Sequence, residues 1–156
     1  SYYNILFKYG VEKFAVKMKE IGMKGAIIPD LPPEEGGDYI KTMKAKNLSP
    51  IYIYSPNTTD ERMKYLATHG SGFMYCVARK GVTGRETRFT DELDAYLDRC
   101  RKGTHLPLAL GFGVKDRKDI EFLKGKVDIA VIGSQTIRVV EEKGPESVGE
   151  FIRQIM

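Results

Sequence analysis

The chain has 156 residues, of which 42% are hydrophobic and 29% are charged, and this composition excludes a disordered or fibrous protein. At roughly 100–200 residues per domain, this length predicts a single domain. The formal net charge is +4, but positive and negative residues are interleaved along the chain, so no nucleic-acid partner is expected. The apolar runs, such as 129–132, are far shorter than the ~20 residues of a membrane span, so no membrane partner is expected either.

Short β-rich runs alternate along the chain with longer segments of helical periodicity. The expected strands are residues 25–28, 50–54, 72–77, 106–110 and 127–132. Several of these runs are apolar throughout, as is typical of parallel strands that are covered on both faces.

The segments around the strands carry helix patterns and helix start signals. The first helical pattern comprises Val11, Phe14, Ala15, Met18 and Ile21. Later helices are expected to begin at an N-capping side chain or at a proline in the first turn, namely Thr58 or Thr59, Thr90, Asp116 and Pro145. Glycines 36 and 37 weaken the helix between the first two strands.

This order predicts an α/β protein with five parallel strands, and two architectures fit it. One is a doubly wound open sheet, and the other is part of a (β/α)₈ barrel. The sequence lacks a Gly-x-Gly-x-x-Gly motif, because Asp116 stands where the third glycine would be, and this argues against a dinucleotide-binding fold.

Neither the cysteines nor the histidines are arranged as metal ligands. Cys76 and Cys100 fall in apolar-periodic segments and are expected to be buried and reduced, which predicts a cytoplasmic protein. His69 and His105 have no ligand partners near them in the sequence, so no metal site is predicted.

In both architectures a ligand binds beyond the carboxyl ends of the strands. Gly111-Phe112-Gly113 follows the fourth expected strand, and Gly133-Ser134 follows the fifth. Glycine turns that lead into helix N-termini allow close approach of an anion, so this pair predicts a phosphate cradle rather than two merely tight turns. In barrels such a cradle follows strands 7 and 8, which would make the first strand here strand 4.

Three other features lie at strand ends. The polar connection 79–88 contains two glycines and is predicted to act as a lid, with a plain surface loop as the alternative. Asp30 could be a general base, but the following Pro32-Pro33 favours a structural role in the turn. Tyr75 is expected to face the interior, where its hydroxyl needs either a ligand or a protein partner.

Together these motifs resemble the alpha subunit family of tryptophan synthase. The segments that carry the resemblance are Tyr-Tyr-Asn at 2–4, Ile-Ile-Pro-Asp-Leu-Pro-Pro-Glu-Glu at 27–35, Ser-Pro-Asn-Thr at 55–58, Arg-Lys-Gly-Val-Thr-Gly at 79–84, Gly-Phe-Gly-Val at 111–114 and Ile-Gly-Ser at 132–134. They occur in the family's order and close to its spacing, over essentially the whole chain.

The resemblance implies a (β/α)₈ TIM barrel, present here as an incomplete barrel of about five βα units, with residues 1–156 as a single domain that forms its C-terminal part. It implies a lyase of tryptophan biosynthesis, which cleaves indole-3-glycerol phosphate to indole and glyceraldehyde 3-phosphate in a retro-aldol reaction. It also implies a beta subunit as partner in an alpha₂beta₂ assembly. Pyridoxal phosphate belongs to that partner, so no cofactor and no metal are expected in this subunit.

The resemblance also assigns site residues. The substrate phosphate would be bound by Gly84, Gly113, Gly133 and Ser134, and Thr83 would lie on the lid. The substrate pocket would be lined by Ile27, Ile53, Tyr75 and Phe112. Tyr2 and Asn4 would lie near the surface that faces the partner.

The family's two catalytic carboxylates, a glutamate and an aspartate, belong to strand 2 and the loop after it, and are expected upstream of Ser1. General acid–base groups contribute ~10²–10⁴-fold each, so this chain is expected to be a fragment that is inactive alone. Its open sheet edges predict self-association or a need for the missing segment in trans. One alternative is a non-catalytic phosphate-binding half-barrel. Another is a different barrel enzyme, such as a phosphoribosyl isomerase, which would not be expected to share the motifs at 29–35 and 81–84.

Overall fold

The computed structural model describes residues 1–77, 91–111 and 113–156. The first half contains α1 (Tyr3–Tyr9), α2 (Val11–Glu20), β1 (Gly25–Ile27), α3 (Gly37–Ala45), β2 (Ser49–Ile51), β3 (Ile53–Tyr54), α4 (Asp60–His69) and β4 (Met74–Val77). The second half contains α5 (Asp91–Gly103), β5 (Leu108–Gly111), α6 (Arg117–Leu123), β6 (Ile129–Ala130), α7 (Ser134–Lys143), the 3₁₀ turn η1 (Pro145–Ser147) and α8 (Val148–Ile155).

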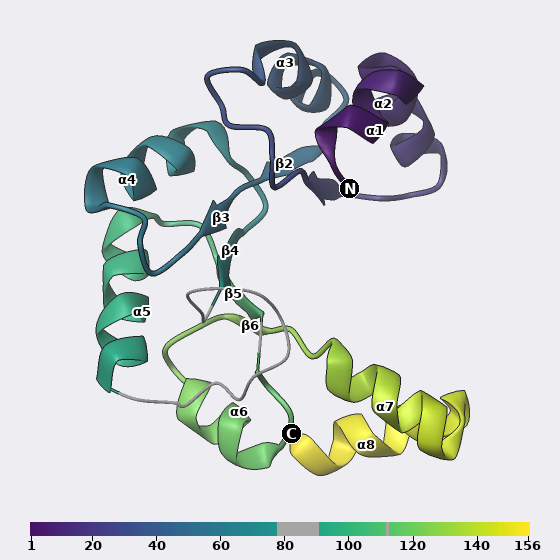
Figure 1. The fold of residues 1–156 in the computed structure, drawn as a ribbon, viewed down its shortest axis with the longest axis vertical. Helices are drawn as coiled ribbons and strands as arrows, with labels where there is room; N and C mark the ends of the chain where they lie inside the picture. Colours follow the sequence, from purple (N-terminus) through teal and green to yellow (C-terminus); the bar gives the residue numbers. More distant parts are fainter. Residues whose placement is uncertain (78–90, 112) are drawn as a thin grey trace.

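The described strands are parallel, and within each sheet every strand pairs with its neighbour in the sequence. One sheet has the order β1-β2 and the other has the order β3-β4-β5-β6. A doubly wound sheet would reverse its order at a switch point, whereas sequential parallel pairing is the pattern of a barrel. Figure 1 shows the helices following one another around the strands in an open arc, from α2 and α3 through α4 and α5 to α6. The fold is therefore an incomplete barrel.

The second expected strand is divided at Tyr52. Before this residue Ile51 pairs with Ile27 of β1, and after it Ile53 pairs with Tyr75 of β4. The Tyr52 carbonyl still accepts a hydrogen bond from the Tyr75 amide at 2.9 Å. The strand thus joins the two sheets by changing partner at a single residue.

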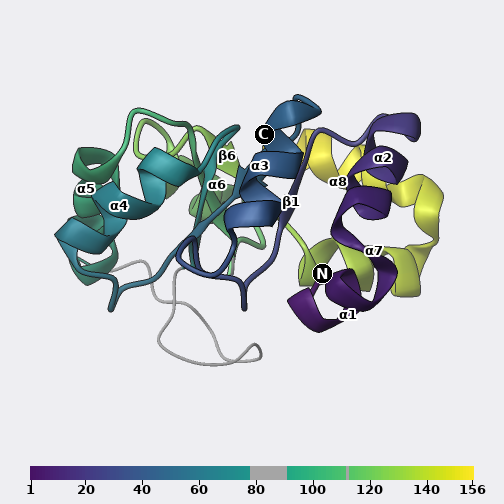
Figure 2. The same cartoon turned by 90° about the horizontal axis from the view of Figure 1, so that it is seen from above.

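The N-terminal segment also differs from the expected pattern, because α1 precedes the helix that the apolar periodicity predicts from Val11. The two helices are separated at Gly10, whose φ of 97° favours glycine. The Gly10 amide donates to the Leu6 carbonyl at 2.9 Å and so ends α1. Figure 2 shows α1 and α2 on the opposite side of the strands from α4 and α5.

Alternating side chains of β4 and β5 build the main core. Met74, Cys76, Leu108 and Leu110 are completely buried, and they pack in one cluster with α4 and α5 residues that include Met63, Leu97 and Cys100. A second cluster joins α1, α2 and α3, and it includes Leu6, Met18, Tyr39 and Met43. Ile40 packs against both clusters and therefore connects them.

The expectation that the strands are covered on both faces holds for β5 but not for β6. All four β5 residues are buried, whereas both β6 residues are exposed, and Ile129 has a relative exposure of 40%. The β6 residues are exposed because β6 is the edge strand of its sheet and pairs only with β5 within the described part of the chain.

Local signals predicted several helix starts correctly. The Thr59 hydroxyl accepts from the Arg62 amide at 3.2 Å and caps α4, so Thr59 rather than Thr58 is the cap. Asp116 caps α6, and Pro145 begins the 3₁₀ turn that leads into α8. Thr90 lies outside the described residues. Cys76 and Cys100 are buried and form no disulfide, as expected.

Asp128 ties together the amino ends of β5 and β6, the face opposite the predicted site. Its Oδ2 accepts from Arg101 Nη2 at 2.5 Å and from the Leu108 amide at 2.7 Å. The hydrogen bond from Arg101, followed by the one from the Leu108 amide, holds the pKa of the Asp128 carboxyl below its ordinary value.

We expect Asp128→Asn to lower the melting temperature at neutral pH, because the neutral amide loses the charge-assisted contact with Arg101. A depressed folded-state pKa means that this stabilisation is present above the unfolded pKa of about 3.9 and is lost as pH falls through the folded value. Thermal unfolding of the wild-type protein and of Asp128→Asn, from neutral to acidic pH, measures this loss of stabilisation. A stability gap of constant size at every pH would show that ionisation of Asp128 is not its source.

Candidate functional site

The predicted pocket residues share one face of the described strands. Ile27, Ile53 and Tyr75 are half-buried, while their neighbours Met74 and Cys76 are buried under the helices. Successive side chains of a strand point to opposite faces, so the pocket residues point away from the helical layer. Ile53 and Tyr75 are direct register partners, and Ile27 pairs with Ile51 on the adjoining sheet.

Tyr75 lies against Gly111 on the neighbouring strand. A Cβ atom built on Gly111 would stand 1.7 Å from the Tyr75 Oη and 2.3 Å from its Cζ. Gly111 is also the buried last residue of β5, which corrects the expectation that the whole Gly111–Gly113 motif follows the strand. The absence of a side chain at Gly111 therefore makes room for a protein side chain rather than for an anion.

Burial raises the pKa of the Tyr75 phenol, so this group stays protonated at neutral pH. The contact with Gly111 is steric, and it does not choose between the two hydrogen-bond partners, a ligand or a protein group, that the sequence left open for the Tyr75 hydroxyl. The ring fills the space in front of Gly111 and lies beside Ile53, its register partner.

The two turns of the predicted phosphate cradle are neighbours. Gly113 follows β5 with a φ of 91°, and Gly133 follows β6 and precedes Ser134, the first residue of α7. Because Leu110 pairs with Ala130, the ends of β5 and β6 lie side by side. Gly113, Gly133 and Ser134 are all exposed, and a Cβ on Gly133 would meet no atom within 4 Å.

The two helices that follow these turns differ at their N-termini. Asp119 Oδ2 accepts from the Lys115 and Asp116 amides at 2.8 and 3.3 Å, and Asp116 accepts from the Asp119 amide at 3.2 Å. These carboxylates place negative charge at the start of α6. At α7 the capping residue is Gly133, which has no side chain, so the first amides can face an incoming anion. The capping-box spacing of Asp116 and Asp119 is the sequence signal that predicts carboxylates at the start of α6, and α7 has no such signal.

Asp30 has the structural role that the following prolines favoured. The Tyr3 amide donates to both carboxylate oxygens of Asp30, at 2.9 and 3.0 Å. This contact joins the start of α1 to the turn after β1. The Ser1 nitrogen also donates to the Ile27 carbonyl at 3.1 Å and attaches the same segment.

A cavity of about 260 Å³ lies beside Asp30, but it is distinct from most of the predicted pocket. Its walls come from the turn after β1, from β2 and β3, and from α4: Ile28, Pro29, Asp30, Leu31, Pro32, Ile51, Tyr52, Ile53, Arg62 and Leu66. It shares only Ile53 with the residues assigned to substrate. At its rim Arg62 forms an ion pair with Glu34, and this hydrogen bond lowers the pKa of the Glu34 carboxyl.

Three predicted site residues cannot be placed in this geometry. Thr83, Gly84 and Phe112 lie outside the described residues, as does the whole segment 79–88 that is predicted to act as a lid. The structure places Ile53 beside Tyr75, with Ile27 on the adjoining sheet, and it places the Gly113 turn beside the Gly133-Ser134 turn.

Sequential parallel pairing of the described strands, with helices around them, places the chain among the (β/α)₈-barrel proteins. A family model described as "Tryptophan synthase alpha chain" matches residues 1–154. The chain belongs to this family.

Individual relatives agree with the family model. The chain is 66% identical to the tryptophan synthase alpha chain of Desulforapulum autotrophicum and 61% identical to that of Syntrophotalea carbinolica, in each case over 99% of this chain and 61% of the relative. The chain thus spans about three fifths of the length of these curated relatives.

Solved structures show the same fold. A structure of the tryptophan synthase alpha₂beta₂ complex from Pyrococcus furiosus contains a chain that matches with a TM-score of 0.84 at 28% identity, over 99% of this chain and 62% of that one. The A-subunit from the same organism matches with a TM-score of 0.85 at 25% identity, over 99% of this chain and 63% of that one.

We expect Gly111→Ala to destabilise the protein by about 1–3 kcal/mol, because the new methyl group would overlap the Tyr75 ring. Gly133→Ala is the matched control, since its Cβ meets open space. In a double-mutant cycle with Tyr75→Ala, the double variant should lose less stability than the sum of the two single variants. Strict additivity of the two unfolding free energies would contradict the contact.

Proposed function

We propose that the protein carrying this chain cleaves indole-3-glycerol phosphate to indole and glyceraldehyde 3-phosphate, as a lyase of tryptophan biosynthesis. Family membership supports this activity, and the observation that carries it in this chain is the adjacency of the Gly113 and Gly133-Ser134 turns. In the reaction the bond between indole C3 and the glycerol side chain breaks. Indole C3 gains a proton, and the adjacent hydroxyl loses one to become the aldehyde.

The residues of this chain bind and orient the substrate. Backbone amides at Gly113, Gly133 and Ser134, with Gly84, hold the phosphate, and the α7 dipole favours its negative charge. Ile27, Ile53 and Tyr75, with Phe112, form the wall against the indole ring, and Thr83 acts on the lid.

Proton transfer falls to carboxylates that this chain does not supply. Asp30 lies in the turn after β1, but both of its oxygens accept from the Tyr3 amide. Asp116 and Asp119 are likewise engaged with backbone amides at the start of α6. We therefore propose that the 156-residue chain binds the substrate but does not cleave it, since these three carboxylates of the described residues are all bonded to backbone amides.

A tryptophan synthase beta subunit is the proposed partner, and it would bring the pyridoxal phosphate. The matching chain in the Pyrococcus furiosus alpha₂beta₂ complex supports this assignment. Tyr2 and Asn4, which the sequence places near the partner-facing surface, are both exposed at the start of α1. The two reduced, buried cysteines are consistent with a cytoplasmic location.

A non-catalytic phosphate-binding half-barrel is the second candidate. The engagement of Asp30 by a backbone amide favours it, because a binding module needs the glycine turns but no acid–base group. Such a module can also self-associate through its open sheet edges, β1 and β6.

The first test is an assay for indole release. We expect no turnover from the 156-residue chain alone and clear turnover from the complete reading frame that carries it, because the proton-transferring carboxylates are needed. Turnover by the chain alone would overturn the proposed division of roles. Substrate binding without turnover by the complete protein would favour the half-barrel module.

The second test measures binding of indole-3-glycerol phosphate to the chain by titration calorimetry. We expect Gly133→Ala to weaken binding at least about tenfold at unchanged melting temperature, because the methyl group occupies the space where the phosphate approaches the α7 amides. Gly37→Ala is the control, since its Cβ also meets no atom within 4 Å but lies at the start of α3, away from the cradle. Equal affinity for both variants would remove Gly133 from the phosphate site.

A further inference from the structure

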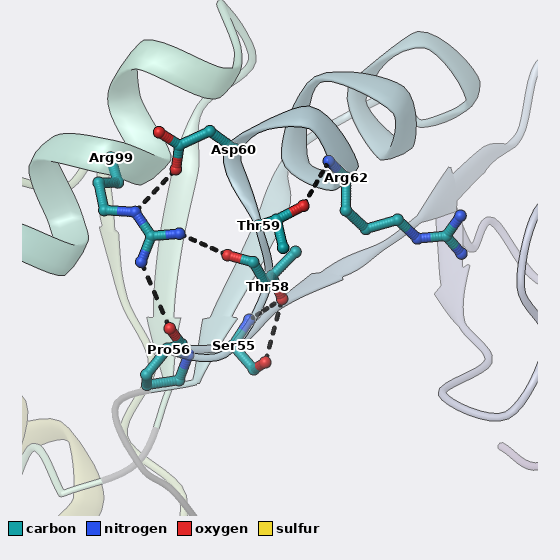
Figure 3. A network of polar contacts seen from close by, with 7 residues as sticks. All are labelled: Ser55, Pro56, Thr58, Thr59, Asp60, Arg62 and Arg99. Atoms are coloured by element: carbon teal, nitrogen blue, oxygen red, sulfur yellow. Dashed lines mark hydrogen bonds and ion pairs between the residues drawn. The ribbon is translucent and has the colours of Figure 1, made fainter.

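A single arginine of α5 fastens the connection between β3 and α4. Arg99 Nε donates to Asp60 Oδ1 at 2.7 Å, Nη2 donates to the Thr58 carbonyl at 2.6 Å, and Nη1 donates to the Pro56 carbonyl at 3.4 Å. Figure 3 shows the guanidinium reaching three separate acceptors of this one connection. A planar guanidinium can satisfy these directions at once, whereas a lysine ammonium cannot match the same fork.

Residues 55–59 of the connection are also hydrogen-bonded to one another, so Arg99 anchors a turn that has its own internal structure. The Thr58 amide donates to the Ser55 carbonyl, and the Ser55 amide donates to Thr58 Oγ1, both at 2.9 Å. The two hydroxyls of Ser55 and Thr58 lie 3.0 Å apart. Thr59 then caps α4 through the Arg62 amide, as Figure 3 also shows. Because the turn is internally bonded, displacing it at Arg99 would move its residues together.

This unit begins directly after a short strand. Tyr54 of this strand is buried, and its hydroxyl donates to the Met63 carbonyl of α4 at 2.7 Å. β3 consists only of Ile53 and Tyr54, and its pairing is with β4 through Ile53–Tyr75 and Tyr54–Cys76. Ile53 precedes the turn by two residues and lines the proposed substrate pocket. The anchoring of the turn to α5 is therefore one of the contacts that act on the placement of Ile53 against Tyr75, beside the strand pairing and the buried Tyr54.

We propose that Arg99 is a positioning residue for substrate binding: by anchoring the turn at 55–59 to α5, it holds Ile53 against Tyr75 in the wall of the pocket. This inference rests on the proposed function for the nature of the substrate. The anchoring itself is a property of the described residues.

The same helix provides a matched control. Arg101, two residues further along α5, donates to Asp128 Oδ2 at 2.5 Å and to the Leu106 carbonyl at 3.4 Å. The two arginine side chains are similarly exposed, at 36% for Arg99 and 44% for Arg101. Arg101 anchors the amino ends of β5 and β6, so its loss removes an equivalent contact at the face opposite the site.

The experiment compares Arg99→Met with Arg101→Met in the complete protein. Both variants should lower the melting temperature. Only Arg99→Met should raise KM for indole-3-glycerol phosphate, by roughly tenfold with kcat changed less than about threefold, because a misplaced wall weakens binding in ground and transition state alike. Only Arg99→Met should also shift the NMR signal of the Ile53 methyl group.

Arg99→Lys serves as the conservative variant. Lysine can keep the contact with Asp60 but loses the fork to the Pro56 and Thr58 carbonyls, so most of the rise in KM should remain. This variant also provides the test if Arg99→Met does not fold. Wild-type KM and an unmoved Ile53 methyl signal in Arg99→Lys would then overturn the proposal.

The two readouts separate the inference from the proposed function. A wild-type protein that does not cleave the substrate would refute the proposed function, while the Ile53 methyl shift still decides whether Arg99 positions the wall. Equal effects of Arg99→Met and Arg101→Met on KM and on the methyl signal would show that Arg99 has a purely structural role.

Discussion

The parallel pairing of β4 with β5 is the contact on which the other elements depend. It joins four residue pairs, from Met74–Leu108 to Val77–Gly111, whereas the pairings of β3 with β4 and of β5 with β6 join only two each. The outer side chains of β4 and β5 are completely buried under α4 and α5 and form the core. Their inner side chains, Tyr75 among them, are then directed to the opposite face by the strand geometry alone.

The same pairing places stabilising contacts at the amino ends of the strands and the proposed binding residues at their carboxyl ends. At the amino ends of the strands, the contact of Arg101 with Asp128 joins α5 to the connection before β6. At the carboxyl ends, carboxylates cap α6 while α7 begins at a bare glycine, so only one of the two neighbouring helix starts is open to an anion. This asymmetry fits the division of barrels into a face of stabilising contacts and a face that carries the ligand site, which here is the proposed one.

Much of the fold could be predicted from the sequence because it depends on neighbours along the chain. The order of strands and helices, the capping residues Thr59 and Asp116 and the burial of the cysteines all follow from local patterns of polarity and side-chain chemistry. The division of the second strand at Tyr52 and the separate helix α1 could not be predicted, since partner exchange between two sheets and a break at Gly10 depend on what packs around them.

The sequence by itself determined that the last two parallel strands lead into glycine turns, and it was sufficient to indicate the family and to predict which residues would bind a phosphate. Only the tertiary structure decided that Gly111 makes room for Tyr75 while Gly133 faces open space, and that Arg99 rather than a neighbour anchors the turn after β3. The physical reason is the same in each case. These contacts join residues that are distant in the chain, and they exist only once the sheet register and the placement of α5 have been set.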